Sequence, residues 1–421
     1  MRMAMLPAAI AVLSVSPPTV NAAEDLESRI NRPEKRTLEP RAMATRQAAT
    51  IADQQAALEG SPERMQWLEQ DIEEKRAESA ARPAKSWLDR IEIAGLIEVE
   101  AQDASSYEGD RESDITLATA ELGIAAQINA WVNVGISFLY EQDETDLEID
   151  VASITLSNPE VTPIFVTAGQ LYVPFGSYET NLVSAPLTLD IGETRQTTLE
   201  VGFVADSFSA SAYLFNGDRK INGENQIGTW GATLGYAYEE SDLLVTLGAG
   251  YISDLGDSDS LQEITNEDRV ETLDTAIAAG LDVTGYSVAP STRTGGWTIN
   301  AAAEFGRFNL IGEYLSATDD FAPQSLAFEE AGAKPSAWNI EADVEFDLMG
   351  RESVAAIAYQ GTREALALEL PQERWLIGWS VEVYRQTSLS LEWAYDRDYD
   401  RAEGGTGETA STLTAQLAVE F

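Results

Sequence analysis

Near Arg90, apolar residues begin to recur at every second position of the chain. From Ile91 to Val99, apolar side chains alternate with acidic and small ones, so an extended segment has one apolar face and one largely acidic face. Similar segments follow at 115–127, 130–141, 146–157, 162–172, 196–205, 207–216, 227–239, 242–253, 297–306, 308–317, 336–347, 352–362, 371–384, 387–398 and 408–421. Membrane strands need about 9–11 residues, whereas strands of soluble sandwiches average about 5–6. The lengths therefore favour membrane strands.

The connections between these sixteen segments alternate in length. Those after even-numbered segments are short, as at Asn129, Asp206 and Arg307. Those after odd-numbered segments are mostly long, at 102–114, 173–195, 217–226, 254–296, 318–335, 363–370 and 399–407, with the short hairpin at 142–145 as the exception. Short periplasmic turns and long outer loops are typical of transmembrane barrels. The pattern predicts an all-β fold, a 16-stranded antiparallel transmembrane β-barrel over residues 90–421.

Aromatic residues and the C-terminus support a location in the outer membrane of a Gram-negative bacterium. An interfacial girdle is expected from the outward aromatics, which are Trp230, Tyr236, Tyr238, Trp297, Phe305, Trp375, Trp379, Trp393 and Tyr395. The last segment alternates apolar and polar residues and ends in Phe421. Such an ending is typical of the signal read by the barrel assembly machinery. We therefore expect outer-membrane lipid and this machinery as partners.

The residues before the barrel divide into two segments. Residues 1–23 have one basic residue, an apolar stretch and a small-residue end, which predicts a signal peptide that is removed on export. Residues 24–89 are rich in helix formers, and Ile51, Leu58, Met65 and Ile72 recur every seven residues. This predicts a helical, coiled-coil-like periplasmic prefix and linker. It would either aid trimer assembly or form a solvated helix.

Charge and composition exclude several functions. The chain has a formal net charge of −44, and residues 90–421 hold 57 acidic against 15 basic residues, so nucleic acid is not an expected partner. It contains no cysteine and no histidine, which excludes disulfides, thiolate or histidine metal sites and Ser/His/Asp catalysis. No apolar run of 18 or more residues follows the N-terminus, which excludes a helical membrane protein. We expect no enzyme, no cofactor and no metal site.

The segment 173–195 is the candidate constriction loop. Pro174 ends the strand before it, and the next twenty or so residues have no clear period. A loop of this length on the third hairpin could fold into the lumen or remain a disordered surface loop. The polar candidates for a constriction are Tyr178, Glu179, Asp190, Glu193 and Arg195. Alternatively, Glu193 and Arg195 pair with the barrel wall and fix the loop.

The inward face predicts an acidic lumen. Its expected pore-lining residues are Glu92, Glu98, Glu304, Glu313, Glu341, Asp343, Glu345 and Glu392. A negative lumen favours cations or neutral solutes over anions, although acidic residues could equally be the general hydrophilic filler of this proteome. The acidic runs at Asp254, Asp257 and Asp259 and at Asp396, Asp398 and Asp400 have ligands suited to calcium. We interpret them as solvated acids of outer loops.

Two segments carry a resemblance to a known family. GQLYVPFGSYETNLVSAPLTLDIGETR at 169–195 and FGRFNLIGEYLSATDDF at 305–321 resemble the LbtU-type siderophore porins. The element from Gly169 to Gly176 is more distantly similar to the phosphate-selective porins O and P. The first resemblance implies an outer-membrane channel for ferric siderophores without a plug domain. Phosphate selection would need a ladder of Arg and Lys, and residues 173–195 contain only Arg195.

The sequence therefore predicts an outer-membrane porin, expected as a homotrimer, for passive or facilitated diffusion of small solutes. Ferric siderophore is the substrate that the resemblance implies. The alternatives are a general or sugar-permeable porin and an outer-membrane tether that uses the helical prefix.

Overall fold

The computed structural model describes residues 90–143, 145–223, 225–262, 264, 292–329 and 331–421. The predicted signal peptide at 1–23 and the helical prefix and linker at 24–89 lie outside these residues, as does most of the connection at 254–296.

The described residues are nearly all strands and loops. The strands are β1 (Ile91–Ser105), β2 (Arg111–Gln127), β3 (Val132–Glu141), β4 (Thr145–Ser157), β5 (Ile164–Tyr172), β6 (Arg195–Ala205), β7 (Phe208–Phe215), β8 (Thr229–Glu240), β9 (Leu243–Ile252), β10 (Gly296–Phe305), β11 (Phe308–Ala317), β12 (Ala327–Phe328), β13 (Ala331–Gly332), β14 (Ser336–Asp347), β15 (Glu352–Arg363), β16 (Glu373–Tyr384), β17 (Thr387–Arg397) and β18 (Thr409–Glu420). The short helices are α4 (Leu187–Gly192), η3 (Ile221–Gly223), η4 (Leu255–Asp257), η5 (Leu366–Leu368) and η6 (Arg401–Glu403).

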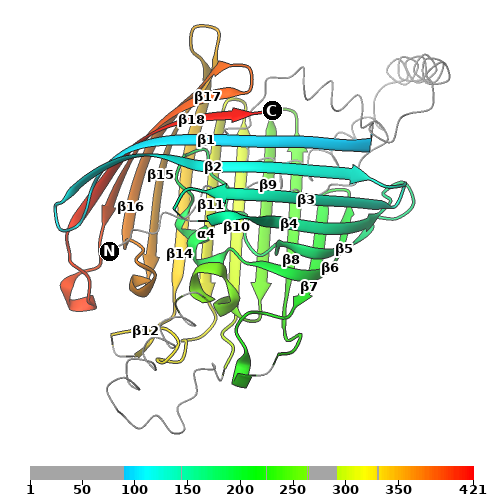
Figure 1. Cartoon of the computed structure of the whole chain (residues 1–421), viewed down its shortest axis with the longest axis horizontal. Helices are drawn as coiled ribbons and strands as arrows, with labels where there is room; N and C mark the ends of the chain where they lie inside the picture. Colours follow the sequence, from blue (N-terminus) through cyan, green and yellow to red (C-terminus); the bar gives the residue numbers. More distant parts are fainter. Residues whose placement is uncertain (1–89, 144, 224, 263, 265–291, 330) are drawn as a thin grey trace.

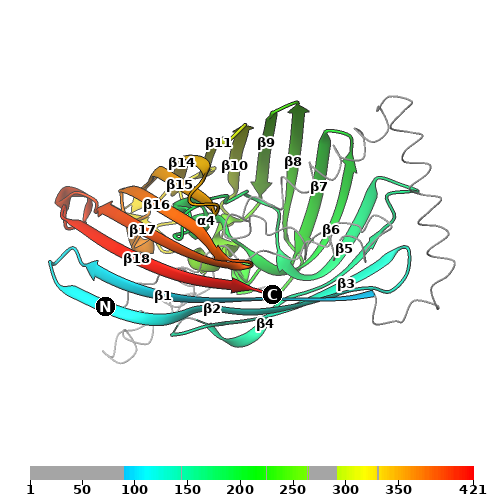
Figure 2. The ribbon, with the colours of Figure 1, turned by 90° about the horizontal axis from the view of Figure 1, so that it is seen from above.

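Sixteen of these strands form one closed barrel, and β12 and β13 form a separate two-stranded sheet. All barrel pairs are antiparallel, and β1 completes the ring by pairing with β18. Figures 1 and 2 show β1–β4 on one side of the ring and β8–β11 on the opposite side. The predicted 16-stranded antiparallel barrel is confirmed, and each predicted segment corresponds to one barrel strand.

The two faces of the barrel wall differ in polarity. Outward side chains such as Ile154, Leu247 and Ile340 are exposed, whereas inward ones such as Thr298 and Gln360 are buried. Successive side chains of a strand point to opposite faces. The period of two in the sequence therefore directs the apolar side chains outward and the polar side chains inward. The barrel is therefore apolar outside and polar inside, the reverse of a soluble protein.

The short turns have a common backbone form. Each of the two-residue turns after β6, β8, β10 and β16 contains a residue at positive φ, namely Asp206, Ser241, Gly306 and Gln386. Positive φ values match the twist of tight hairpins, which is why small and polar residues occupy these positions. These turns lie at the end of the barrel opposite the longer loops, as the connection lengths predicted.

The connection expected at 102–114 is largely strand, which corrects the predicted boundary. β1 continues to Ser105 and β2 begins at Arg111, and residues pair across the whole extension. Apart from Ala104 the side chains there are polar, so the apolar–polar alternation that marks a membrane strand disappears while the hydrogen-bonded ladder continues. The hairpin therefore extends beyond the apolar band.

The C-terminal residue closes the barrel. The backbone N–H of Phe421 donates to the carbonyl of Gly95 at 3.1 Å, and the N–H of Gly95 donates back at 2.9 Å. The Phe421 ring lies where a side chain on Gly95 would be, so a larger residue at position 95 would displace the ring. Phe421 therefore helps to fix the seam between β1 and β18.

Candidate functional site

The candidate site is the loop between β5 and β6, residues 173–194, which we call the inner loop. Its ends meet where the N–H of Val173 donates to the carbonyl of Thr194 at 2.9 Å. The loop contains α4, whose six residues are all buried. In Figure 2, α4 lies inside the ring of strands. The inner loop therefore folds into the barrel, and it contacts the wall formed by β9–β17.

The first contact with the wall is at Phe175. Thr298 of β10 donates its hydroxyl to the Phe175 carbonyl at 2.8 Å. That carbonyl lies over Gly250 of β9, and a Cβ added to Gly250 would approach its oxygen to 2.0 Å. Glycine is required at position 250 because the backbone of the inner loop comes so close to the wall.

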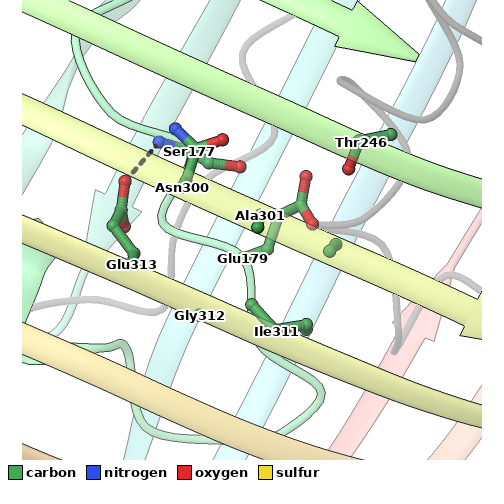
Figure 3. Close-up of a pocket in the computed structure, with 9 residues that line it drawn as sticks. Ser177, Glu179, Thr246, Asn300, Ala301, Ile311, Gly312 and Glu313 are labelled. Atoms are coloured by element: carbon green, nitrogen blue, oxygen red, sulfur yellow. Dashed lines mark hydrogen bonds between the residues drawn. The ribbon is translucent and has the colours of Figure 1, made fainter. Parts of the chain in front are cut away.

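Glu313 of β11 is the first of three carboxylates that hold the inner loop. It accepts hydrogen bonds from the backbone N–H groups of Ser177 and Tyr178, at 2.8 and 3.0 Å, and from the hydroxyl of Thr188 at 2.8 Å. The Ser177 bond is the dashed line in Figure 3. Ser177 and Glu179 line a small pocket together with Glu313 and Asn300 of the wall. One wall carboxylate therefore joins the start of the loop to α4.

Glu341 of β14 is the second carboxylate. It accepts from the hydroxyl of Thr180 at 2.6 Å and from the backbone N–H of Asn181 at 2.7 Å. The side-chain amide of Asn181 also donates to Asp343 at 2.8 Å. Glu341 is fully buried under these contacts.

Glu392 of β17 is the third carboxylate. The backbone N–H groups of Val183 and Ser184 donate to it at 2.6 and 3.2 Å, and the Ser184 hydroxyl donates at 2.5 Å. Hydrogen bonds to a charged group contribute about 1.5–3 kcal/mol each, and a buried carboxylate without partners would be costly. The three carboxylates are therefore satisfied by the loop itself, without a basic side chain in these contacts.

An apolar core on the side of the long loops also holds α4. Leu187 and Ile191 of α4 are fully buried in it. Its other members include Phe175 of the inner loop itself. Others come from the barrel rim and the loops after β9, β11 and β15, among them Leu255, Leu261, Phe321, Leu326, Ala333 and Ala365. The inner loop is thus packed against outer loops as well as bonded to the wall.

The structure places the five predicted constriction residues in different environments. The Tyr178 hydroxyl is buried, and Glu179 is 4% exposed. Asp190 lies on α4, where burial raises the pKa of its carboxyl to about 7 against the opposing effect of Arg374. Glu193 ends α4, and burial followed by the nearby charge of Asp259 raises the pKa of its carboxyl well above the usual range.

Arg195 is the first residue of β6, and its side chain contacts β4 instead of the wall that holds α4. Its guanidinium pairs with Glu148 and with Asp150 of β4, the latter at 3.1 Å. The hydroxyl of Tyr172 also donates to Asp150, at 2.8 Å. Arg195 therefore joins the base of the inner loop to the wall formed by β1–β4.

The predicted pore-lining acids divide into two groups. Glu313, Glu341, Asp343 and Glu392 are buried beneath the inner loop. Glu92, Glu304 and Glu345 are partly exposed on the inward face, and Glu98 is 9% exposed on the inward face of β1. The first group contacts the loop, and the second lies on parts of the wall away from these contacts.

The acids of the outer loops are less solvated than the sequence suggested. Asp254 and Asp257 are fully buried, so their interpretation as solvated acids is wrong. Arg219 pairs with Asp254 at 2.5 Å, and its backbone N–H donates to Asp257 at 2.9 Å. Burial raises the pKa of Asp254 to about 6, although Arg219 opposes the shift. Arg219 packs these acids into the loop core, a role that its position in the sequence did not indicate.

The second acidic run is also partly buried, which again differs from the expectation. Asp396 and Asp398 are each 6% exposed. Arg374 forms two hydrogen bonds with Asp396, at 2.7 and 2.9 Å. In the part of the chain that the structure describes, no three acidic residues lie in an arrangement that could hold a metal ion.

Sequence reasoning missed the groups of the inner loop that bind the wall. The phase of their strands identifies Glu313, Glu341 and Glu392 as inward, but their partners are mainly backbone N–H groups, which no residue type reveals. Three of the four side-chain partners, Thr180, Asn181 and Ser184, are small polar residues within four positions of one another. This cluster was the available signal. Among the described helices, none is long and apolar enough to cross a membrane.

The chain is similar to proteins of Legionella and Coxiella. It is 28% identical over 340 residues to a UPF0422 protein of Legionella pneumophila strain Paris, a match that covers 74% of this chain and 62% of that protein. It is also 28% identical over 340 residues to a UPF0422 protein of Coxiella burnetii, covering 78% of this chain and 69% of the relative. The chain thus spans 62% of the length of the Legionella relative. No family model matches the chain.

Solved porins share the fold at low sequence identity. The anion-selective porin from Comamonas acidovorans matches with a TM-score of 0.51 and 13% identity, covering 79% of this chain and 99% of that one. The outer membrane channel DcaP of Acinetobacter baumannii matches with a TM-score of 0.51 and 12% identity, covering 79% and 97%. The barrel is therefore porin-like, and at this identity the likeness concerns the fold alone.

Proposed function

We propose that the protein is an outer-membrane channel through which small hydrophilic solutes diffuse passively past the inner loop. The observation that carries this proposal is the anchoring of the inner loop inside the barrel by Glu313, Glu341 and Glu392. A loop attached in this way narrows the lumen of a sixteen-stranded barrel and leaves the rest of the cross-section open. The apolar outer face and polar inner face support a location in lipid.

In this proposal the predicted site residues have four roles. Tyr178, Glu179, Asp190 and Glu193 shape the constriction from the loop, and Arg195 holds its base against the β1–β4 wall. Glu313, Glu341, Asp343 and Glu392 position the loop. Glu92, Glu98, Glu304 and Glu345 line the aqueous path. Arg374, which could otherwise attract anions, is paired with Asp396.

Ferric siderophore uptake is the second candidate function, and one observation favours it. The two segments that resemble siderophore porins, 169–195 and 305–321, contact each other directly through Glu313 and the N–H groups of Ser177 and Tyr178. They form one structural unit at the constriction, where a family-specific cargo would be selected. A general or sugar-permeable porin remains the simpler alternative.

The remaining parts of the proposal concern export and assembly. A signal peptide at 1–23 would direct export, and the Phe421 end would be recognised by the barrel assembly machinery. The prefix at 24–89 would support a homotrimer from the periplasm. Deletion of 24–86 discriminates this proposal from a tether: a tether would lose its phenotype, whereas a channel would keep its conductance.

Liposome swelling tests the proposed function. The full mature chain is reconstituted and challenged with a size series of sugars and, separately, with a ferric siderophore. A channel admits the small sugars and excludes the larger ones, and a siderophore porin also admits the iron complex. Heat-denatured protein is the control. If neither the sugars nor the siderophore enter, the transport function is wrong.

A further inference from the structure

The wall formed by β1–β4 carries acids that the inner loop does not satisfy. Its inward carboxylates include Glu98 on β1, Glu121 on β2, Glu141 on β3 and Glu148 and Asp150 on β4. Strand register brings them together. Glu98 lies opposite Thr119, and Glu121 and Glu148 both lie opposite Leu139. These five carboxylates therefore lie on the inner face of four adjacent strands.

Few positive charges face this group. Arg195 pairs with Glu148 and Asp150. Within the described ranges, no ion pair joins a basic side chain to Glu98, Glu121 or Glu141, which lie on the three strands farther from Arg195. The acidic wall therefore keeps a net negative charge.

The carboxylate of Glu141 is buried with only one of its two oxygens hydrogen-bonded to the described residues. The residue is 2% exposed, and one carboxylate oxygen accepts from the hydroxyl of Thr145 at 2.8 Å. The other oxygen, Oε1, is buried and has no hydrogen-bond partner in the described structure. A buried carboxylate oxygen without a donor is costly, and a cation that approaches it would remove that cost.

The opposite wall provides the contrast. Glu313, Glu341 and Glu392 each accept at least two hydrogen bonds from the inner loop, so donors of the loop satisfy these carboxylates and cover them. Solvent reaches the β1–β4 side, where the side chain of Glu148 is 39% exposed and that of Arg195 is 25% exposed. Of the three acids without a basic partner in the described ranges, Glu121 is half-buried on this side, so solvent reaches part of the unpaired charge.

We propose that the conduction path runs between the inner loop and the β1–β4 wall, and that Glu98, Glu121 and Glu141 make it select small cations. This inference rests on the proposed channel function and names the solute class that the channel favours. No three acids in the described part of the chain are arranged to hold a metal ion, so the wall attracts passing, partly hydrated cations instead of chelating one.

Planar-bilayer recording of the full chain under a tenfold KCl gradient tests the inference. The expected reversal potential has the sign of K⁺ permeation. The triple variant Glu98→Gln, Glu121→Gln and Glu141→Gln should reduce the ratio of K⁺ to Cl⁻ permeability by about threefold or more, since three charges leave the path. The matched control is Glu108→Gln, Asp110→Asn and Glu112→Gln, which removes three exposed charges from the β1–β2 hairpin and should leave the ratio nearly unchanged.

A second variant keeps the test valid if the triple variant does not fold. Glu121→Gln alone should lower the permeability ratio in the same direction. Chloride preference in the unmodified protein, or an unchanged ratio in both variants, would overturn the inference while leaving the channel function intact. A complete lack of conductance would overturn the channel function and, with it, this inference.

Discussion

The backbone N–H of Asn181, in the inner loop, donates a 2.7 Å hydrogen bond to Glu341 on the far strand β14. The two residues are 160 positions apart. The sequence alone allowed the loop to lie on the surface and Glu341 to line an open pore. In the structure this bond joins the two. It explains both features at once, because the acid holds the loop and the loop covers the acid.

Glu341→Ala should loosen the inner loop. The change removes the acceptor for Thr180 and Asn181, and each hydrogen bond to a charged group contributes about 1.5–3 kcal/mol. We expect noisier single-channel currents and a larger mean conductance. Asp242→Asn, which neutralises an exposed acid in the β8–β9 turn, is the control and should behave like the unmodified protein. Quiet, unchanged currents in Glu341→Ala would show that the loop does not depend on this residue.

Gly250→Ala should displace the inner loop at Phe175. The added Cβ would lie 2.0 Å from the Phe175 carbonyl oxygen, and overpacking of this kind costs about 1–3 kcal/mol. The expected result is lower thermal stability of the folded barrel, measured by loss of heat-resistant migration on gels. Gly312→Ala is the matched control, because its nearest neighbour would be 3.9 Å away. Equal melting of the two variants would contradict the close contact.

Arg195→Gln should both destabilise the barrel and strengthen its preference for cations. The substitution leaves Asp150 buried without its basic partner, and breaking a buried pair in this way costs about 3–5 kcal/mol. It also removes the positive charge that faces the β1–β4 wall. Melting and reversal potentials measure the two effects. Arg397→Gln changes an exposed, 4.0 Å pair with Glu373 and should alter neither. A shift toward chloride in Arg195→Gln would argue against a cation path along this wall.

The loop after β9 should be more stable at pH 5 than at pH 8. Burial raises the pKa of Asp259 to about 7, although the N–H and charge of Arg195 oppose the shift. Because an unfolded Asp has a pKa near 4, the folded state holds the proton more tightly, and stability falls as pH rises between about 4 and 7. Hydrogen exchange of the amides at 253–262 should therefore be slower at pH 5, after correction for intrinsic rates.

Asp259→Asn tests the source of this pH dependence. It keeps one acceptor oxygen for the N–H of Arg195 and removes the titration. The difference in exchange between the two pH values should become smaller. An undiminished difference would assign the effect to the neighbouring acids Asp254 and Asp257.

The strands were predictable and the inner contacts were not. Alternation over residues such as 336–347 fixes which side chains face inward, and that information is local in the sequence. What an inward acid contacts depends on how a loop from another part of the barrel folds. The phase of Glu341 was therefore readable, whereas its burial under Asn181 was not. The same reason applies to Asp254, whose burial depends on Arg219.

Cross-linking the inner loop to the wall tests the central claim most directly. The chain has no cysteine, so the pair Asn181→Cys and Asp343→Cys introduces the only two thiols, at side chains whose polar atoms are 2.8 Å apart. A short bifunctional thiol reagent should join them in intact outer membranes. The control pair Asn181→Cys and Leu247→Cys, with Leu247 on the outer face, should not be joined. Efficient linkage only in the first pair is the predicted result, and equal or no linkage would contradict a loop anchored inside the barrel.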